Sequence, residues 1–218
     1  MVRHVLGAGI LALAMSAVPG VSGAVLFNNG APDQISGDNM SEALVADDFT
    51  IPGQSNVTNI RFWSIQSDLA DYDGVVYWEI YSDGGGVPNG SLFSGTASVT
   101  ATATGNSTGF GYDEYVFDIP VAFQLAAGTY WLGLHNGPTN NGILTEMLWA
   151  TTNPGSGSSG SYLIPPDGSG PWVSTLQEHA FRIDGDPLNN VIPEPGTFAL
   201  LGGGLCVAAL MRRRRSSR

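Results

Sequence analysis

The amino-acid sequence predicts an all-β fold, an antiparallel β-sandwich of jelly-roll type, with a hydrophobic helix at the C-terminal end. Short runs in the middle of the chain alternate apolar and polar residues with a period of two, as in GVVYWEIYSD (74–83) and GTYWLGLHN (128–136). Turn sequences such as NNG and PNG separate these runs, and none of the runs has the spacing of an amphipathic helix. About nine or ten strands of this spacing are typical of a two-sheet sandwich.

Residues 1–24 have the layout of a secretory signal peptide. A basic start at Arg3 is followed by an apolar run over residues 5–18, a Pro-Gly break and the small residues Ser22-Gly23-Ala24. We expect signal peptidase to cleave after Ala24, with Gly23 as a close alternative. An uncleaved anchor is the other interpretation of this segment. The prediction is therefore an exported protein.

Residues 25–187 are expected to form one β-sandwich domain outside the cytoplasm. Their length fits a single domain, and they contain no cysteine, so packing and backbone pairing must hold the fold together. The chain has no lysine, and Arg61 and Arg182 are the two arginines of the stretch 25–192, against 18 acidic residues. A formal charge of about −16 argues against binding to nucleic acid or anionic lipid.

Two stretches of unusual composition add further features to this domain. The stretch SGTASVTATATGNSTG (94–109) alternates small polar residues, which predicts an exposed edge strand or a long hairpin. The stretch TNPGSGSSGSYLIPPDGSGPW (152–172) is rich in glycine, serine and proline and predicts long loops.

Residues 188–218 form a separate C-terminal tail. An apolar run over residues 197–211 is expected to form a short transmembrane helix of about 22 Å, less than the roughly 30 Å of a bilayer core. Cationic side chains after the run keep the C-terminal end on the cytoplasmic side and can lengthen the span by snorkelling. These side chains are Arg212, Arg213, Arg214 and Arg215. The preceding Pro193, Glu194 and Pro195 cannot continue a helix and leave an extended segment beside the membrane.

The order of Pro-Glu-Pro, short apolar helix and arginine cluster resembles the PEP-CTERM family of exported bacterial proteins. The resemblance covers residues 192–218, and Pro193, Glu194 and Pro195 carry the motif. It implies an inner-membrane intermediate, recognition by an exosortase with removal of the tail, and a final place at the cell surface or in the extracellular matrix. It also implies bacteria that make exopolysaccharide and biofilm. An ordinary membrane anchor is the alternative interpretation.

Calcium is the metal that the sequence favours, if any. Asp68, Asp71 and Asp73 precede Gly74 in SDLADYDG, and hard cations prefer several oxygen ligands from one turn. Plain turn-forming aspartates are the alternative. The two histidines of the domain, His135 and His179, could join Glu178 or Glu146 in a metal or acid–base site, but their spacing matches no ligand motif.

A carbohydrate platform is the most specific binding site that the sequence suggests. Trp149, Tyr162 and Trp172 lie in or beside the loop-rich region, where binding residues tend to collect. Aromatic side chains that anchor their own loops are the alternative. The phrases VADDFTI (45–51) and FQLAAGTYWLGL (123–134) also loosely resemble exported bacterial β-sandwiches, including carbohydrate-binding modules.

The sequence thus favours an exported, exosortase-sorted protein without catalytic activity, acting structurally or in association with polysaccharide in a biofilm. A carbohydrate-binding module or a calcium-dependent adhesin is the alternative, and a glycoside hydrolase is a further one, since two carboxylates at suitable separation cannot be recognised by counting acids.

Overall fold

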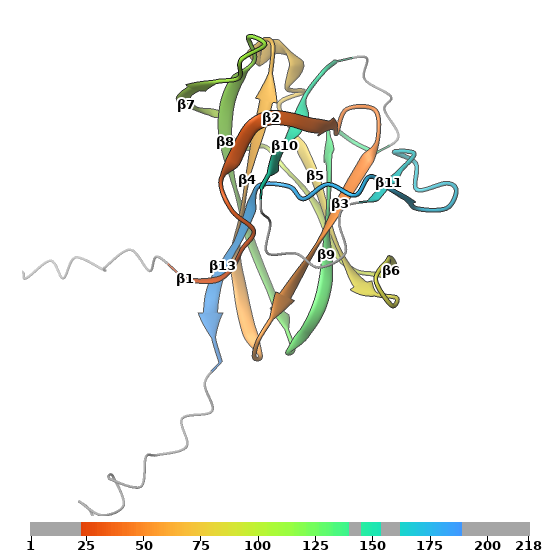
Figure 1. Cartoon of the computed structure of the whole chain (residues 1–218). Helices are drawn as coiled ribbons and strands as arrows, with labels where there is room; N and C mark the ends of the chain where they lie inside the picture. The colour runs from red at the N-terminus through yellow and green to blue at the C-terminus, as the bar shows by residue number, and fades with distance from the viewer. Residues whose placement is uncertain (1–22, 140–144, 154–161, 189–218) are drawn as a thin grey trace, which may run out of the picture.

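The computed structural model describes residues 23–139, 145–153 and 162–188 and confirms an all-β fold with two antiparallel sheets (Figure 1). The seven-stranded sheet contains β1 (Ala24–Asn28), β2 (Pro32–Asn39), β4 (Ser55–Gln66), β7 (Thr102–Ser107), β8 (Asp113–Leu125), β10 (Leu148–Thr152) and β13 (Phe181–Pro187). The six-stranded sheet contains β3 (Leu44–Ile51), β5 (Val76–Asp83), β6 (Pro88–Ala97), β9 (Gly128–Asn136), β11 (Tyr162–Ile164) and β12 (Val173–Ser174). A single 3-10 turn, η1 (Leu69–Asp71), is the helical element of the described residues.

Eight of the strands have the jelly-roll order. They pair as nested hairpins, β1 with β13, β3 with β9, β4 with β8 and β5 with β6. The pairs β13 with β4 and β9 with β5 then join these hairpins into the orders β1-β13-β4-β8 and β3-β9-β5-β6. This is the double Greek key of a jelly roll. The further strands β2, β7, β10, β11 and β12 extend the two sheets and explain why the strand number exceeds the nine or ten expected.

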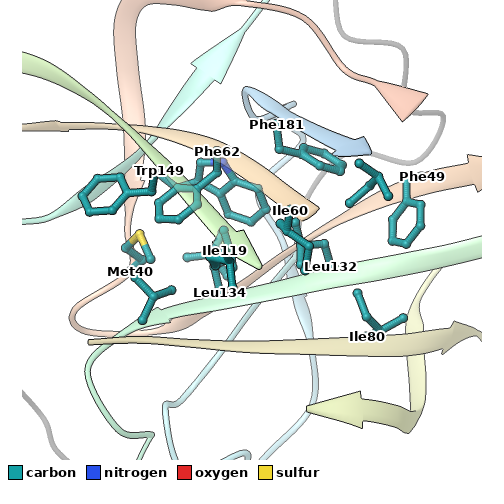
Figure 2. Packing of buried hydrophobic residues seen from close by; sticks show 14 of the residues in the cluster. Met40, Phe49, Ile60, Phe62, Ile80, Ile119, Leu132, Leu134, Trp149 and Phe181 are labelled. Carbon is teal, nitrogen blue, oxygen red and sulfur yellow. The ribbon is translucent and has the colours of Figure 1, made fainter. Parts of the chain in front are cut away.

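The core lies between the two sheets, and alternating residues of strands such as β4 and β9 fill it (Figure 2). Ile60 and Phe62 of β4 are fully buried, and the Phe62 ring stacks on Phe117 of β8 at a centroid distance of 4.8 Å. Leu132 and Leu134 of β9 enter the core from the opposite sheet. The period of two in the sequence therefore marks the inward faces of these strands correctly.

Strand β3 is buried on both faces. Val45 and Phe49 belong to the main core, whereas Leu44 and Ala46 pack on the outer side of the sheet with Ile164 of β11. Asp47 points into the sandwich with Val45 and Phe49, because alternate residues of a strand share a face. A carboxylate among core residues must find a partner, and this one does so at the candidate site described below.

The polar stretch over residues 94–109 supplies edges to both sheets. Its first part ends β6, which lies at the edge of the six-stranded sheet, and its second part forms β7, which pairs only with β8 among the described strands. Every residue of β7 is exposed. The prediction of an exposed edge is therefore confirmed, and the small polar side chains suit a strand with water on both faces.

Both arginines of the domain lie on the outer face of the seven-stranded sheet. Arg182 of β13 stands opposite Arg61 of β4, and the two are paired with carboxylates on neighbouring positions. Arg61 Nη2 lies 2.7 Å from Asp118 Oδ2, and Arg182 Nε lies 2.8 Å from Asp184 Oδ1. Both arginine charges of the described residues are thus paired with carboxylates.

The strands run from Ala24 to Pro187, close to the expected domain of residues 25–187. Ala24, assigned above to the signal peptide, stands opposite Gly185 as the first residue of β1, so cleavage after Gly23 would leave this strand whole. Residues 1–22 of the signal peptide, the Pro193–Pro195 segment, the apolar run over 197–211 and Arg212–Arg215 lie outside the described residues. Within residues 23–139, 145–153 and 162–188, no helix is long and apolar enough to cross a membrane.

Candidate functional site

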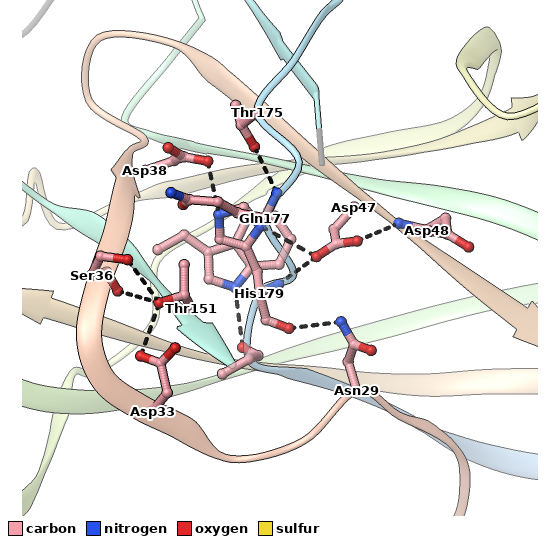
Figure 3. Close-up of polar contacts among 12 residues, drawn as sticks. Asn29, Asp33, Ser36, Asp38, Asp47, Asp48, Thr151, Thr175, Gln177 and His179 are labelled. Carbon is pink, nitrogen blue, oxygen red and sulfur yellow. Dashed lines mark hydrogen bonds and ion pairs between the residues drawn. The ribbon is translucent and has the colours of Figure 1, made fainter. Parts of the chain in front are cut away.

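A fully buried histidine lies between the two sheets and is held by two aspartates (Figure 3). His179 precedes β13, and its Nδ1 lies 3.2 Å from Asp47 Oδ2 of β3 in the six-stranded sheet. Its Nε2 lies 3.2 Å from Asp38 Oδ2 of β2 in the seven-stranded sheet. The backbone N–H of His179 also donates to Asp47 Oδ2, at 2.5 Å. The imidazole therefore ties the two sheets together at this end of the sandwich.

The charge of this histidine follows from its neighbours. Burial alone would lower the pKa of His179, but the hydrogen bonds and negative charges of Asp38 and Asp47 outweigh burial and raise the pKa to about 9. Burial raises the pKa of the Asp47 carboxyl, and the adjacent Asp48 adds to this, while the contacts with His179 oppose the shift. His179 is consequently protonated at neutral pH and forms a buried ion pair.

The ion pair makes the stability of the fold depend on pH. A histidine whose pKa rises from the ordinary 6.5 to about 9 on folding stabilises the protein fully below pH 6.5. We expect the free energy of unfolding to fall by about 3 kcal/mol between pH 6.5 and pH 9. Chemical denaturation at several pH values measures this change.

The control for the pH dependence is the variant His179→Gln, whose stability should stay nearly flat across the same window. Burial lowers the pKa of His135, so that histidine titrates below pH 6.5 and does not contribute in this range. A wild-type protein that keeps its full stability up to pH 9 would contradict the assignment of a charged His179.

Trp149 of β10 forms one wall around the histidine. Its ring centroid lies 4.7 Å from that of His179, and its Nε1–H donates to the carbonyl oxygen of Ala180 at 3.1 Å. The backbone of Ala180 in turn donates to the carbonyl of Ala150 at 2.8 Å. A tilted stack of a protonated imidazole on an indole is favourable because the ring face is electron-rich.

Three carboxylates next to the histidine could hold a cation. One oxygen from each of Asp47, Asp48 and Glu178 lies within 4.8 Å of the others, which makes them the one such group of metal-ligating side chains among the described residues. Glu178 Oε2 accepts a hydrogen bond of 3.0 Å from Asn29 Nδ2, and the same amide also donates to the carbonyl oxygen of His179. Carboxylate oxygens suit calcium, although the protonated His179 already neutralises part of this charge.

A polar cavity of about 420 Å³ opens beside this network. Its walls are Asp33 and Ser36 of β2, residues 151–153 at the end of β10, and residues 176–178 before β13. The walls carry hydroxyl, amide and carboxylate groups, and Glu178 belongs both to the cavity and to the carboxylate group around Asp47. The volume lies in the range of about 300–1,000 Å³ that is usual for small-ligand pockets.

The predicted calcium ligands in SDLADYDG are used for a local turn. Asp68 caps η1 and accepts from the backbone N–H of Ala70 at 2.9 Å, while Asp71 Oδ2 accepts from the backbone N–H of Asp68 and from the hydroxyl of Ser67. Asp73 lies in the same loop, where its N–H donates to Asn136. Asp68 and Asp71 thus make local capping contacts, and the close group of three carboxylates among the described residues lies elsewhere. Calcium binding at Asp68, Asp71 and Asp73 stays a prediction.

The predicted carbohydrate platform is wrong in its first member. Trp149 is 0% exposed, because β10 pairs with both β2 and β4 and turns the indole into the core, where no sugar can stack on it. Trp172 is partly buried and packs edge-on against Tyr81 at 5.5 Å. Tyr162 begins β11 in the other sheet, opposite Ala46 and Ser174, and its side chain lies outside the described part of the structure. Trp149 therefore shares no exposed surface with the other two.

The outer face of the six-stranded sheet holds a second polar group that the sequence did not reveal. Glu79 of β5 is 9% exposed, and its Oε2 accepts hydrogen bonds of 2.6 Å from the hydroxyls of both Tyr77 and Tyr81. Burial, together with the nearby Glu79 carboxylate, raises the pKa of Tyr77 to about 12. Period-two spacing places the three residues on one face, which is the signal that could have found them.

The network around His179 was not predicted from the sequence either, although the sequence contains one indication of it. Asp47-Asp48 interrupts an otherwise apolar strand, and an acidic pair there requires a buried cationic or hydrogen-bonding partner. The partners are 132 residues away along the chain, as the Asp47–His179 contact shows, so the sequence alone cannot identify them.

Comparison with protein families finds one match, at the end of the chain. Residues 191–215 match the PEP-CTERM protein-sorting motif, a range that includes Pro193–Pro195 and Arg212–Arg215. The resemblance drawn from the sequence is confirmed. No curated protein matches the chain. The matched motif concerns sorting and does not extend into the folded domain.

Proposed function

The chain carries a PEP-CTERM protein-sorting motif at residues 191–215, which marks it as an exported exosortase substrate, and on that premise we propose that it is a cell-surface or matrix protein without catalytic activity. The motif implies a membrane-anchored intermediate that an exosortase processes. After processing, the β-sandwich acts outside the cell, by structural contact or in association with polysaccharide. The sorting motif is the observation that carries this proposal.

The state of the two histidines supports a non-catalytic role. A general base must be unprotonated and must reach its substrate, whereas His179 is 0% exposed, protonated at neutral pH and enclosed by two aspartates. His135 is equally buried, and its Nδ1 lies 3.0 Å from the carbonyl oxygen of Gly137. Neither ring is placed to exchange a proton with a substrate.

Calcium remains the alternative cofactor, on a different set of ligands from the one predicted. Asp47, Asp48 and Glu178 are close enough to share a cation, as a calcium-dependent adhesin would require.

Sorting is tested by changing Pro193, Glu194 and Pro195 together to alanine. We expect the wild-type protein to be released from the inner membrane without its arginine cluster. The variant should keep the cluster and stay in the membrane fraction, because it lacks the extended segment that the exosortase recognises. Cell fractionation followed by mass spectrometry of the intact protein measures both results.

A matched control changes the same residue types within the folded domain, Pro165, Glu146 and Pro166 to alanine. This control should be processed like the wild type. Wild-type protein that reaches the cell surface with Arg212–Arg215 still attached would contradict processing by an exosortase.

A further inference from the structure

We propose that the cavity between β2, β10 and residues 176–178 is a binding site for a neutral, hydroxyl-rich ligand, a saccharide residue being the chemical class that fits it best. This inference rests on the proposed function, because it names the class of ligand that the exported domain would bind outside the cell. It assigns binding to residues other than the aromatic side chains expected from the sequence. The volume, the lining groups, the backbone and the charge each support it.

The lining groups match the hydroxyls of a sugar. Asp33 and Glu178 offer carboxylate oxygens that accept hydrogen bonds, while Ser36 and Thr151 offer hydroxyls and Asn153 an amide. A saccharide presents several hydroxyls that both donate and accept, so a wall of mixed donors and acceptors can satisfy it from more than one side. An apolar ligand would match none of these polar groups and would displace water from them.

The walls are already held in place by hydrogen bonds. Thr151 Oγ1 lies 2.9 Å from Asp33 Oδ1 and 2.8 Å from the carbonyl oxygen of Ser36, which fixes β2 against β10. The N–H of Thr152 donates to the carbonyl oxygen of Glu178 at 2.8 Å, which fixes β10 against the third wall. His179 anchors that wall between Asp38 and Asp47 and thereby acts as a positioning residue. A site ordered before binding loses less entropy when the ligand arrives.

The backbone is strained on both sides of the cavity. Gln34 and Leu176, with φ of 65° and 60°, are the two non-glycine residues with positive φ among the described residues. Gln34 precedes the lining residue Ser36 by two positions, and Leu176 itself lines the cavity. Strain of this kind amounts to roughly 1–3 kcal/mol per residue and tends to gather at functional sites.

Leu176, with its positive φ, is also strongly exposed. Its side chain is 84% exposed and forms an apolar flank beside a polar wall. A sugar ring has apolar C–H faces together with polar hydroxyl edges, so one ring can contact both surfaces at once. If this turn only connected two strands, glycine would adopt the positive φ with less backbone strain than leucine.

The negative charge of the domain favours neutral or cationic sugars as ligands over anionic ones. Two arginines stand against 18 acidic residues in the stretch 25–192, and both arginines are paired on the outer face of the seven-stranded sheet. Two of these 18 acidic residues, Asp33 and Glu178, lie at the cavity itself. An anionic sugar such as a uronate would meet repulsion from all of these groups.

The test is a titration of the full-length chain, in a mild detergent, with neutral hexose oligosaccharides and with uronate oligosaccharides of equal length. We expect binding of the neutral series. Leu176→Gly and Thr151→Val should each weaken it by about tenfold or more, because each removes one contact with the ring or one hydroxyl partner. Thr129→Val is the matched control for Thr151→Val, since Thr129 also bonds a neighbouring hydroxyl, that of Thr50, but on an exposed part of the other sheet.

Leu176→Gly separates binding from folding. Glycine accepts a positive φ without strain, and the leucine side chain buries little, so the melting temperature of this variant should stay the same or rise while binding falls. Binding that is unchanged in both variants, equal binding of uronates, or no binding of neutral sugars at millimolar concentration would overturn the proposal.

Calcium chloride without sugar is the remaining arm of the titration. A large rise in melting temperature with calcium, reversed by EDTA, in a protein that binds no neutral sugar would assign this end of the domain to a cation instead. Mass spectrometry of the same preparation from cells reports processing separately. A protein that is correctly processed but binds no sugar would overturn the cavity proposal alone and leave the sorting proposal intact.

Discussion

Replacing His179 by glutamine should lower the free energy of unfolding by about 3–5 kcal/mol, the usual result of removing one partner from a buried ion pair. Asp47 is 0% exposed and receives from His179 both a ring contact and a backbone hydrogen bond. Without the His179 imidazolium, the Asp47 carboxylate would either stay buried without a neighbouring positive charge or take up a proton. Urea denaturation of both proteins at pH 6.5 measures the difference.

Two further variants make the result specific. The double variant Asp47→Asn, His179→Gln removes the buried charge together with its partner and should recover part of the loss. His135→Gln is the matched control, because His135 is also 0% exposed but has a neutral backbone partner instead of carboxylates. Its expected loss is about 1–3 kcal/mol. Equal losses for the two histidines would argue against the ion pair.

Replacing Trp149 by alanine should lower the free energy of unfolding by about 3–5 kcal/mol. The indole is 0% exposed, contacts the rings of Phe62, Phe181 and His179, and donates a hydrogen bond to the Ala180 carbonyl. Alanine would leave a large cavity between the sheets and remove one of the two hydrogen bonds that the Ala180 carbonyl accepts, the other coming from the N–H of Trp63. The midpoint of denaturation should fall while the slope of the transition stays the same.

Trp172→Ala is the comparison for this variant. Trp172 is only partly buried and makes an edge contact with Tyr81 outside the main core, so its removal should cost less than half as much stability. If the two variants lost the same stability, Trp149 would not be the core residue that the structure shows.

The fold could be predicted from the sequence because the evidence for it is local. Each strand carries its own alternation, as with Ile60 and Phe62 of β4, and the turn residues between strands need no knowledge of distant partners. The tail could be predicted for the same reason, since motif, apolar run and arginines are contiguous. The role of Asp68 and Asp71 is also local, but a cap and a calcium loop use the same residue types, and only the geometry separates them.

The candidate site could not be predicted because it depends on contacts far apart in the chain. Trp149 stands beside a loop-rich stretch, and its burial comes from pairing with β2 and β4, about a hundred residues earlier. His179 meets Asp38 and Asp47 only because β2 and β3 belong to different sheets that close over it. The positive φ of Leu176 has no sequence signal, since leucine is uncommon in that conformation.

The pairing of β1 with β13 determines how the domain stands on the membrane before the tail is cut. Ala24 lies opposite Gly185, so the polypeptide enters and leaves the sandwich at the same pole (Figure 1). Residues 188–196 link β13 to the apolar run and can reach no more than about 32 Å, so this pole stays near the bilayer surface. The cavity proposed for a saccharide is lined by residues that precede Phe181, at the other end of β13 from the tail, so the tether does not start beside it.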